Sequence, residues 1–306
     1  MHHHEHIGKL SRTLVVAIVL NAIIVIGEIV GGIIGNSLAL LSDALHNLGD
    51  LFALILSLFA SRLALRKANA KSSFGYIRSE IIISFINSSI LLLIGVFIIY
   101  EGIVRIQEPQ EIKGNLLIII ALISFFANAY SSYLLHSHSK DDLNAKSSYL
   151  HLFYDAIHSL AIVVVGIFIH LFNWTFLDAL SSVVIGVFMI KSSWSVVSES
   201  AQILNEGTPK EIDHHEVEEY LKSFPEIKGI HHLHIWKLSS TFIALSVHIT
   251  VEDQPVSSAY LIIDKIEKAL MEKFKINHPT IQVEAEHHDC SDKPQLLAIT
   301  NISEKS

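Results

Sequence analysis

Charged residues are scarce in this chain of 306 residues. Only 17% of its residues are Asp, Glu, Lys or Arg, whereas soluble domains average about 25%, and 51% of its residues are hydrophobic. This balance excludes an ordinary soluble enzyme and a disordered protein. A net charge of -8 without a basic stripe also excludes a nucleic-acid binder. The excess of hydrophobic side chains must therefore face membrane lipid.

Cysteine is almost absent, because Cys290 is the only one. An intrachain disulfide is therefore excluded, and thiolate-rich metal sites are disfavoured. Histidine is abundant instead, with 19 residues, and imidazole is the commonest metal ligand in proteins. The first residues contain four of these histidines, and we assign residues 1–12 to a cytoplasmic tail. This tail fits a native metal-binding segment and the remnant of a purification tag equally well.

Six hydrophobic stretches are long enough to cross the ~30 Å hydrocarbon core of a bilayer. No small-residue cleavage site follows the first stretch, which therefore reads as an uncleaved span and not as a signal peptide. We predict an all-α bundle of six transmembrane helices within residues 13–206, with spans at about 13–34, 38–61, 80–104, 114–135, 147–171 and 175–198.

The orientation follows from the basic residues in the short loops. The loops after the first and fifth spans contain none, whereas the loop after the second span contains Arg62, Arg66, Lys67, Lys71 and Arg78. By the positive-inside rule this loop is cytoplasmic, and with six spans both termini are cytoplasmic too. We expect a multi-pass protein of the cytoplasmic (inner) membrane of a bacterium.

The pattern changes after about residue 206, where continuous hydrophobic runs give way to alternation. Residues 207–290 predict a helix at 211–223, strands at 228–238 and 241–251, a helix at 257–275 and a last strand at 279–286. This αββαβ order suits a cytoplasmic α+β ferredoxin-like domain that lacks one strand. Residues 291–306 are expected to form a disordered tail.

Two of the predicted spans carry the same His-x-x-x-Asp spacing, as His46 with Asp50 and His151 with Asp155. Residues four apart lie on one face of a helix, so each span presents one imidazole and one carboxylate towards a single point. Two nitrogen and two oxygen ligands favour tetrahedral zinc, although cobalt and cadmium remain alternatives. Ionisable groups within a membrane usually mark an ion pathway.

Other polar residues have less definite roles. Glu28 lies in a stripe of small residues, where we expect close helix packing and one interhelical hydrogen bond. The roles of four further candidates stay open, namely Asp43, His158, His136 and His138.

Histidines also gather in the predicted soluble domain. Strand alternation places His232 and His234 on one face and His231 on the other. Adjacent strands could then bring His231, His248 and Glu284 together. We expect His214 and other histidines outside this group to be solvated surface residues.

Several segments resemble the signatures of the cation diffusion facilitator family, namely Gly35–Asp50, Phe74–Glu80, Asp142–Asn144 and His231–Trp236. The resemblance extends from about residue 10 to residue 290. It implies a homodimeric exporter of divalent metal, driven by inward proton flow, and the His-x-x-x-Asp pairs resemble those of the zinc-selective branch. By this match His46, Asp50, His151 and Asp155 form the transport site.

The resemblance also implies a second zinc site at the dimer interface of the cytoplasmic domain. His231, His248 and Glu284 match its ligand positions, and Glu286 is a further candidate ligand. Zinc would then be both the transported substrate and a regulatory ligand, with protons as the counter-substrate. A loop site present in some members is doubtful here, because Asn69, Ser72 and Tyr76 stand near Phe74.

Metal and protons compete for the same imidazole and carboxylate groups, which supplies a mechanism for antiport. The predicted function is zinc efflux by zinc/proton antiport, and the protein is not expected to be an enzyme. Two other functions are alternatives, an intramembrane aspartyl hydrolase that uses Asp50 and Asp155, and a membrane metal sensor without transport. A hydrolase would not need the histidine of either pair. A sensor without transport, in contrast, is compatible with the same sequence.

Overall fold

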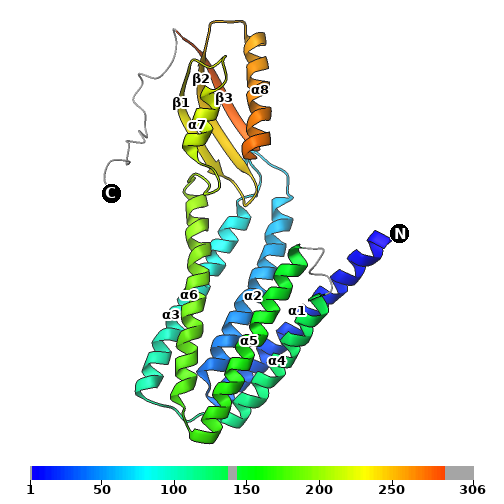
Figure 1. Ribbon diagram of the computed structural model, residues 1–306, viewed down its shortest axis with the longest axis vertical. Coiled ribbons are helices and arrows are strands. Elements are labelled where there is room, and N and C mark those ends of the chain that lie inside the picture. The colour runs from blue at the N-terminus through cyan, green and yellow to red at the C-terminus, as the bar shows by residue number, and fades with distance from the viewer. Residues whose placement is uncertain (1, 137–142, 287–306) are drawn as a thin grey trace. The chain divides into compact units, whose positions relative to one another are not determined.

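The computed structural model describes residues 2–136 and 143–286. These residues form two compact units, which Figure 1 shows with their elements labelled. The first unit contains the residues up to Ala60 together with Ile83–Val197, and the second contains Ser61–Ile82 and the chain from Ser198 onward. The tail predicted at residues 291–306 lies outside the described residues.

Six helices are long and hydrophobic enough to cross a membrane, which confirms the predicted spans. They are α1 (His2–Gly35), α2 (Leu38–Ala64), α3 (Ser79–Gln107), α4 (Gly114–His136), α5 (Leu143–Phe172) and α6 (Phe176–Leu204). Residues 2–12, which we assign to the tail, are helical and continue into α1.

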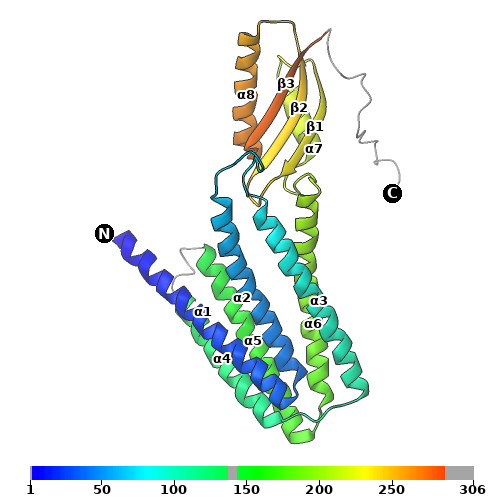
Figure 2. The ribbon, with the colours of Figure 1, turned by 180° about the vertical axis from the view of Figure 1, so that it is seen from behind.

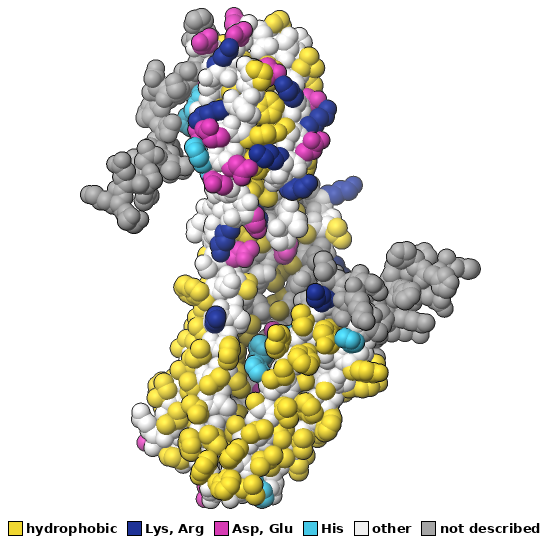
Figure 3. All heavy atoms as spheres, in the orientation of Figure 1, with side chains coloured by type: hydrophobic (Ala, Val, Ile, Leu, Met, Phe, Trp, Pro, Cys, Tyr) yellow, Lys and Arg dark blue, Asp and Glu magenta, His cyan; other side chains and the backbone are white. Residues whose placement is uncertain are grey.

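Side chains on the outside of the helical unit are mostly hydrophobic, as Figure 3 shows in yellow. Within the unit α1 packs against α4 and α4 against α5, and both pairs lie side by side in Figures 1 and 2. A buried hydrophobic cluster links α2, α3, α4, α5 and α6 through Ala39, Leu40, Ile98, Leu117, Ala121, Ile162, Val163, Ile169, Ile185 and Met189. This arrangement is that of a helical bundle that exposes hydrophobic side chains to lipid.

Two predicted breaks between spans are sharp turns. Asn36, between α1 and α2, has φ 54°, and Asn173, between α5 and α6, has φ 59°. Asparagine visits this left-handed region more readily than most residues, so each turn reverses the chain within a few positions. The hairpins that result place consecutive helices antiparallel.

The second unit contains the predicted α+β domain. Its order is α7 (His214–Lys222), β1 (Gly229–Lys237), β2 (Ile243–Val251), α8 (Val256–Phe274) and β3 (His278–Ala285), which confirms the αββαβ prediction. The sheet order is β1-β2-β3, with β1 antiparallel and β3 parallel to β2. A parallel pair needs a crossover connection, and α8 provides it.

One hydrophobic core joins α7 and α8 to the sheet. Val217 and Leu221 of α7, and Ile266 and Leu270 of α8, are buried in the same cluster as strand residues such as Leu245. Both helices therefore cover the same face of the sheet, as Figure 2 also shows. The other face remains available for the polar residues of β1, β2 and β3.

Candidate metal centres

The two His-x-x-x-Asp pairs meet inside the helical unit. His46 and Asp50 lie one turn apart on α2, with Nε2 of His46 3.6 Å from Oδ2 of Asp50. On α5, Nε2 of His151 is 3.5 Å from Oδ2 of Asp155, and it is also 3.4 Å from Oδ2 of Asp50. The four side chains therefore form one constellation that spans two helices.

Two carboxylate oxygens of this constellation have no hydrogen-bond partner among the described residues. They are Oδ2 of Asp50 and Oδ2 of Asp155, and both atoms are shielded from solvent. Removal of a carboxylate oxygen from water is costly unless a partner compensates for it. These oxygens are therefore available to a bound cation, together with the two imidazoles.

The spacing of these atoms suits a small tetrahedral ion. Ligands about 2.0–2.2 Å from zinc at tetrahedral angles lie about 3.3–3.6 Å from one another. The three nitrogen–oxygen distances of 3.4, 3.5 and 3.6 Å fall within this range. The remaining distances are longer, because no three of these ligand atoms lie within 4.8 Å of one another, so zinc binding requires the side chains to move closer together.

His158 is close to this constellation. Its ring centroid is 6.4 Å from that of His46, and its Nδ1 atom is buried without a hydrogen-bond partner among the described residues. Of the other open candidates, His136 packs 5.1 Å from the ring of Tyr149, and His138 lies outside the described residues. Asp43 is buried on α2, where its carboxyl group lies beside that of Glu28 of α1.

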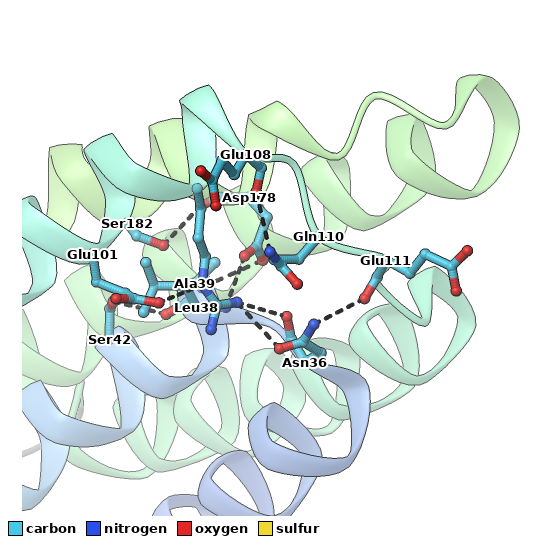
Figure 4. Close-up of polar contacts among 11 residues, drawn as sticks. Asn36, Leu38, Ala39, Ser42, Glu101, Glu108, Gln110, Glu111, Asp178 and Ser182 are labelled. Carbon is cyan, nitrogen blue, oxygen red and sulfur yellow. Dashed lines mark hydrogen bonds and ion pairs between the residues drawn. The ribbon is translucent and has the colours of Figure 1, made fainter.

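Asp178 anchors the start of α2, a role that the sequence did not reveal. This buried residue of α6 accepts hydrogen bonds from Oγ of Ser37 at 2.5 Å and from the backbone N–H groups of Leu38 and Ala39 at 2.7 and 3.3 Å. Figure 4 shows its carboxylate directed at the first turn of α2. A carboxylate in this position caps the free N–H groups of the helix and complements its dipole.

Arg105 secures the same turn from α3. It donates to the backbone oxygen of Asn36 at 3.0 Å and is paired with Glu101 at 2.9 Å. The side chain of Asn36 in turn donates to the carbonyl of Glu111 at 3.1 Å (Figure 4). The helix that carries His46 and Asp50 is thus held at its beginning by contacts from α3 and α6.

A second group of ligand-bearing side chains lies on the open face of the sheet. His231 and His248 are direct partners across β1 and β2, and Glu284 lies on β3. The Glu284 carboxylate contacts Nε2 of His231 at 3.1 Å and Nδ1 of His248 at 3.0 Å, and one ligand atom from each residue lies within 4.8 Å of the others. Gln282 also donates to Glu284 at 2.7 Å, which orients the carboxylate.

The predicted alternation of β1 is wrong at His232. The strand has an irregularity between His231 and His234, and His232 has φ 52°, so the side chains do not alternate there. As a result the ring centroid of His232 lies 5.3 Å from that of His231 and 5.0 Å from that of His248. A further imidazole thereby joins the group that His231, His248 and Glu284 form.

Neighbouring histidines are also less solvated than predicted. Partial burial lowers the pKa of His234, and nearby His232, His214 and His248 lower it further. His214 is half-buried at the start of α7, with its Nε2 atom 3.1 Å from the carbonyl of Leu233. Glu286, in contrast, is exposed beyond the end of β3 and is not part of the cluster.

The loop after α2 contains no metal cluster among its described residues. Asn69 Oδ1 instead accepts hydrogen bonds from the backbone of Lys71 and Ser72, and its Nδ2 donates to the hydroxyl of Tyr76 at 3.3 Å. These contacts form a polar turn.

A bundle of six membrane-spanning helices with an internal His/Asp constellation, joined to a small α+β domain with its own His/Glu cluster, defines a multi-pass membrane transporter of metal cations. The chain belongs to the cation efflux family. Residues 14–205 match the cation efflux transmembrane domain, and residues 209–286 match the cytoplasmic domain of cation efflux proteins.

Relatives cover nearly the whole chain. The metal cation efflux system protein CzcD of Cupriavidus metallidurans is 34% identical, over 96% of this chain and 93% of its own length. A cadmium, cobalt and zinc/H(+)-K(+) antiporter of Bacillus subtilis is 36% identical, over 94% of each chain. The zinc transporter ZitB of Pectobacterium atrosepticum is 32% identical, over 94% of this chain and 89% of its own length.

Proposed function

We propose that this protein exports Zn²⁺ from the cytoplasm in exchange for protons, with His46, Asp50, His151 and Asp155 as the transport site. The observation that carries the proposal is the convergence of the two helix pairs at 3.4 Å between His151 and Asp50. Efflux of metal cations agrees with the family, and zinc is named for the relatives from Bacillus subtilis and Pectobacterium atrosepticum.

The ligand set favours zinc over harder and softer cations. Magnesium and calcium prefer six or more oxygen ligands, and copper(I) prefers thiolates, whereas two imidazoles and two carboxylates suit zinc. Cobalt and cadmium are named with zinc for the relative from Bacillus subtilis, so they are the competitors against which selectivity is to be measured.

Proton exchange follows from the chemistry of these ligands. An imidazole binds metal only when it is neutral, and a carboxylate only when it is ionised, so protons and zinc compete for the same atoms. Zinc loads where protons are scarce and leaves where they are abundant. Exchange of two protons for one zinc would be electroneutral. Exchange of one proton would move a net positive charge outward, against an inside-negative membrane potential.

We assign a regulatory role to the cytoplasmic cluster of His231, His248 and Glu284, with His232 beside it. Three ligands within 4.8 Å on the open face of the sheet leave positions for a ligand from another molecule. We therefore propose that a second zinc binds where two cytoplasmic domains meet in a homodimer. The match to the cytoplasmic domain of cation efflux proteins supports this role.

The location and orientation of the protein follow from its loops. The five basic residues in the segment 62–78 support a cytoplasmic position for that loop and for both termini. The bacterial relatives support the inner membrane of a bacterium.

The aspartyl hydrolase gains no support from the family, because the relatives are named as efflux proteins, antiporters and transporters.

The test is zinc flux into proteoliposomes by the wild type and by two variants of α5. Asp155→Asn keeps the size of the side chain but removes the charge and one ligand oxygen, so zinc flux should fall to the level of empty vesicles. Ser159→Ala, one turn further along α5 and also buried, is the matched control and should transport normally. Normal flux in Asp155→Asn would exclude the assigned site, and no flux in the wild type would exclude the function.

A further inference from the structure

A pair of buried carboxyl groups lies in the helical unit outside the zinc ligands. Glu28 of α1 and Asp43 of α2 have relative exposures of 0% and 2%, and their carboxyl groups are within hydrogen-bonding reach of each other. Among the described residues, the other charged group that acts on both is Asp155 of α5, and α4 contributes the uncharged Ser124. The pair thus has no cationic partner among the described residues.

Two adjacent carboxylates do not both ionise in such a site while Asp155 is also negatively charged. Burial disfavours each charge, and each negative charge also repels the other, so one proton is held between them. The same situation arises wherever two carboxyl groups share a dry site, and the proton then belongs to the pair.

The hydrogen bonds around the pair also require a proton. Asn47 donates its Nδ2 to Oε2 of Glu28 at 3.2 Å. Oε1 of Glu28 and Oδ1 of Asn47 remain buried without a hydrogen-bond partner among the described residues, and both side chains are almost fully buried. Ser124 also donates to Glu28, but two ionised carboxylates cannot hydrogen-bond to each other. A protonated carboxyl group supplies the missing donor.

Helix packing encloses the pair on one side. One turn after Glu28, a Cβ atom at Gly31 would lie 2.7 Å from Cγ1 of Ile120, so only glycine allows α1 to approach α4 this closely. Small residues that permit such contact are typical of tightly packed membrane helices. The carboxyl pair is thereby enclosed on the side of α4.

We infer that Glu28 and Asp43 form a proton-binding site in the helical unit, which takes up one of the protons exchanged for zinc and lies apart from the zinc ligands. This inference rests on the proposed zinc/proton exchange. Zinc bound between Asp50 and Asp155 neutralises their two negative charges, so these carboxylates no longer repel a negative charge on the pair, which favours its ionisation. The O–H bond then breaks, the proton passes to water, and the pair carries one further negative charge. When zinc leaves, the pair takes up a proton again.

This coupling is reciprocal. If zinc expels the proton from the pair, the proton must weaken zinc binding by the same factor. The pair therefore strengthens the competition that antiport requires without contributing a ligand to the metal.

The experiment counts the protons released when zinc binds to the purified full-length protein, by titration calorimetry in buffers of different ionisation enthalpy. Wild type is compared with Glu28→Gln and with Glu28→Asp, and the cytoplasmic site is the same in all three. We expect Glu28→Gln to release about one proton fewer per protein than the wild type, and Glu28→Asp to restore the wild-type count. Asp43→Asn should have the same effect as Glu28→Gln, because the pair shares one proton.

A second measurement needs no variant. Infrared difference spectra of the wild type should show the loss of a protonated carboxyl C=O band when zinc is added. The inference is overturned if no such band is lost, or if wild type and Glu28→Gln release equal numbers of protons. Zinc binding that depends on potassium concentration but not on pH would assign the pair to an alkali cation instead. If the wild type does not bind zinc in its helical unit, the proposed function is contradicted. Normal zinc binding with equal proton release in wild type and Glu28→Gln contradicts the role of this pair alone.

Discussion

The Nε2 atom of His151 lies 3.4 Å from the Oδ2 atom of Asp50, although α5 and α2 carry these residues about a hundred positions apart. This contact joins two identical motifs into one centre. Any relative movement of α2 and α5 changes this distance directly. A transport site built across two helices can therefore lose its cargo when the helices move, whereas a site within one helix would travel with it.

Asp50 should be indispensable, because its carboxylate lies between His46 and His151. We expect Asp50→Asn to weaken zinc binding in the helical unit by more than about 100-fold. Loss of a residue that only supports a metal ligand already lowers metal affinity by about 10–100-fold. The measurement is equilibrium zinc binding in a background that carries His248→Ala. Ser42→Ala, a buried neighbour on α2, is the control and should bind like the parent. Equal affinities in Asp50→Asn and the parent would remove Asp50 from the site.

The His46 imidazole should set the choice between zinc and cadmium. His46→Asp replaces a nitrogen ligand with a flexible carboxylate, which discriminates less against a larger ion. We expect the ratio of zinc flux to cadmium flux to fall in this variant, measured with both ions under the same pH gradient. An unchanged ratio would show that packing around the site, and not the ligand, determines selectivity.

The cytoplasmic cluster should tune transport without being essential for it. We expect His248→Ala to abolish the zinc-dependent approach of two cytoplasmic domains and to raise the zinc concentration for half-maximal flux. Zinc should bind better to the arrangement in which the two domains are close, so it raises the population of that arrangement. The separation is measured by energy transfer between two probes during a zinc titration. His215→Ala, an exposed histidine of the same domain, is the control, and identical titrations in His248→Ala and wild type would refute the regulatory site.

Asp178 should matter for stability through the start of α2. Loss of a helix cap costs about 1 kcal/mol, and here three hydrogen bonds to Ser37, Leu38 and Ala39 are lost together. We therefore expect Asp178→Ala to lower the unfolding temperature in detergent and to reduce zinc affinity through displacement of α2. Ser181→Ala, whose hydroxyl bonds to the backbone of its own helix α6, should change neither value. An unaltered unfolding temperature in Asp178→Ala would show that Asp178 does not anchor the helix.

Much of the fold could be predicted because its causes are local. Six hydrophobic stretches predicted the spans, and the spacing of His46 with Asp50 and of His151 with Asp155 predicted one face on each helix. Alternation likewise predicted strands that bring His231 to His248. These patterns depend on helix and strand periods, which the chain shows directly.

The remaining features depend on residues far apart in the chain. The cap on α2 comes from Asp178, 140 positions beyond Leu38, and no local pattern links the two. The position of His232 depends on a left-handed residue within a strand, which alternation cannot anticipate. Glu28 was correctly expected to make an interhelical hydrogen bond, but its partner Asn47 and its proximity to Asp43 emerged only from the packed helices.

The most direct test of zinc/proton exchange is zinc uptake into proteoliposomes with pH gradients of opposite direction. A dye inside the vesicles reports zinc, and a second dye reports pH. We predict that an acidic interior drives zinc inward while the interior becomes more alkaline, that reversal of the gradient abolishes the accumulation, and that Asp155→Asn shows neither signal. Zinc accumulation at the same rate and extent under both gradients, with no change in internal pH, would contradict the exchange.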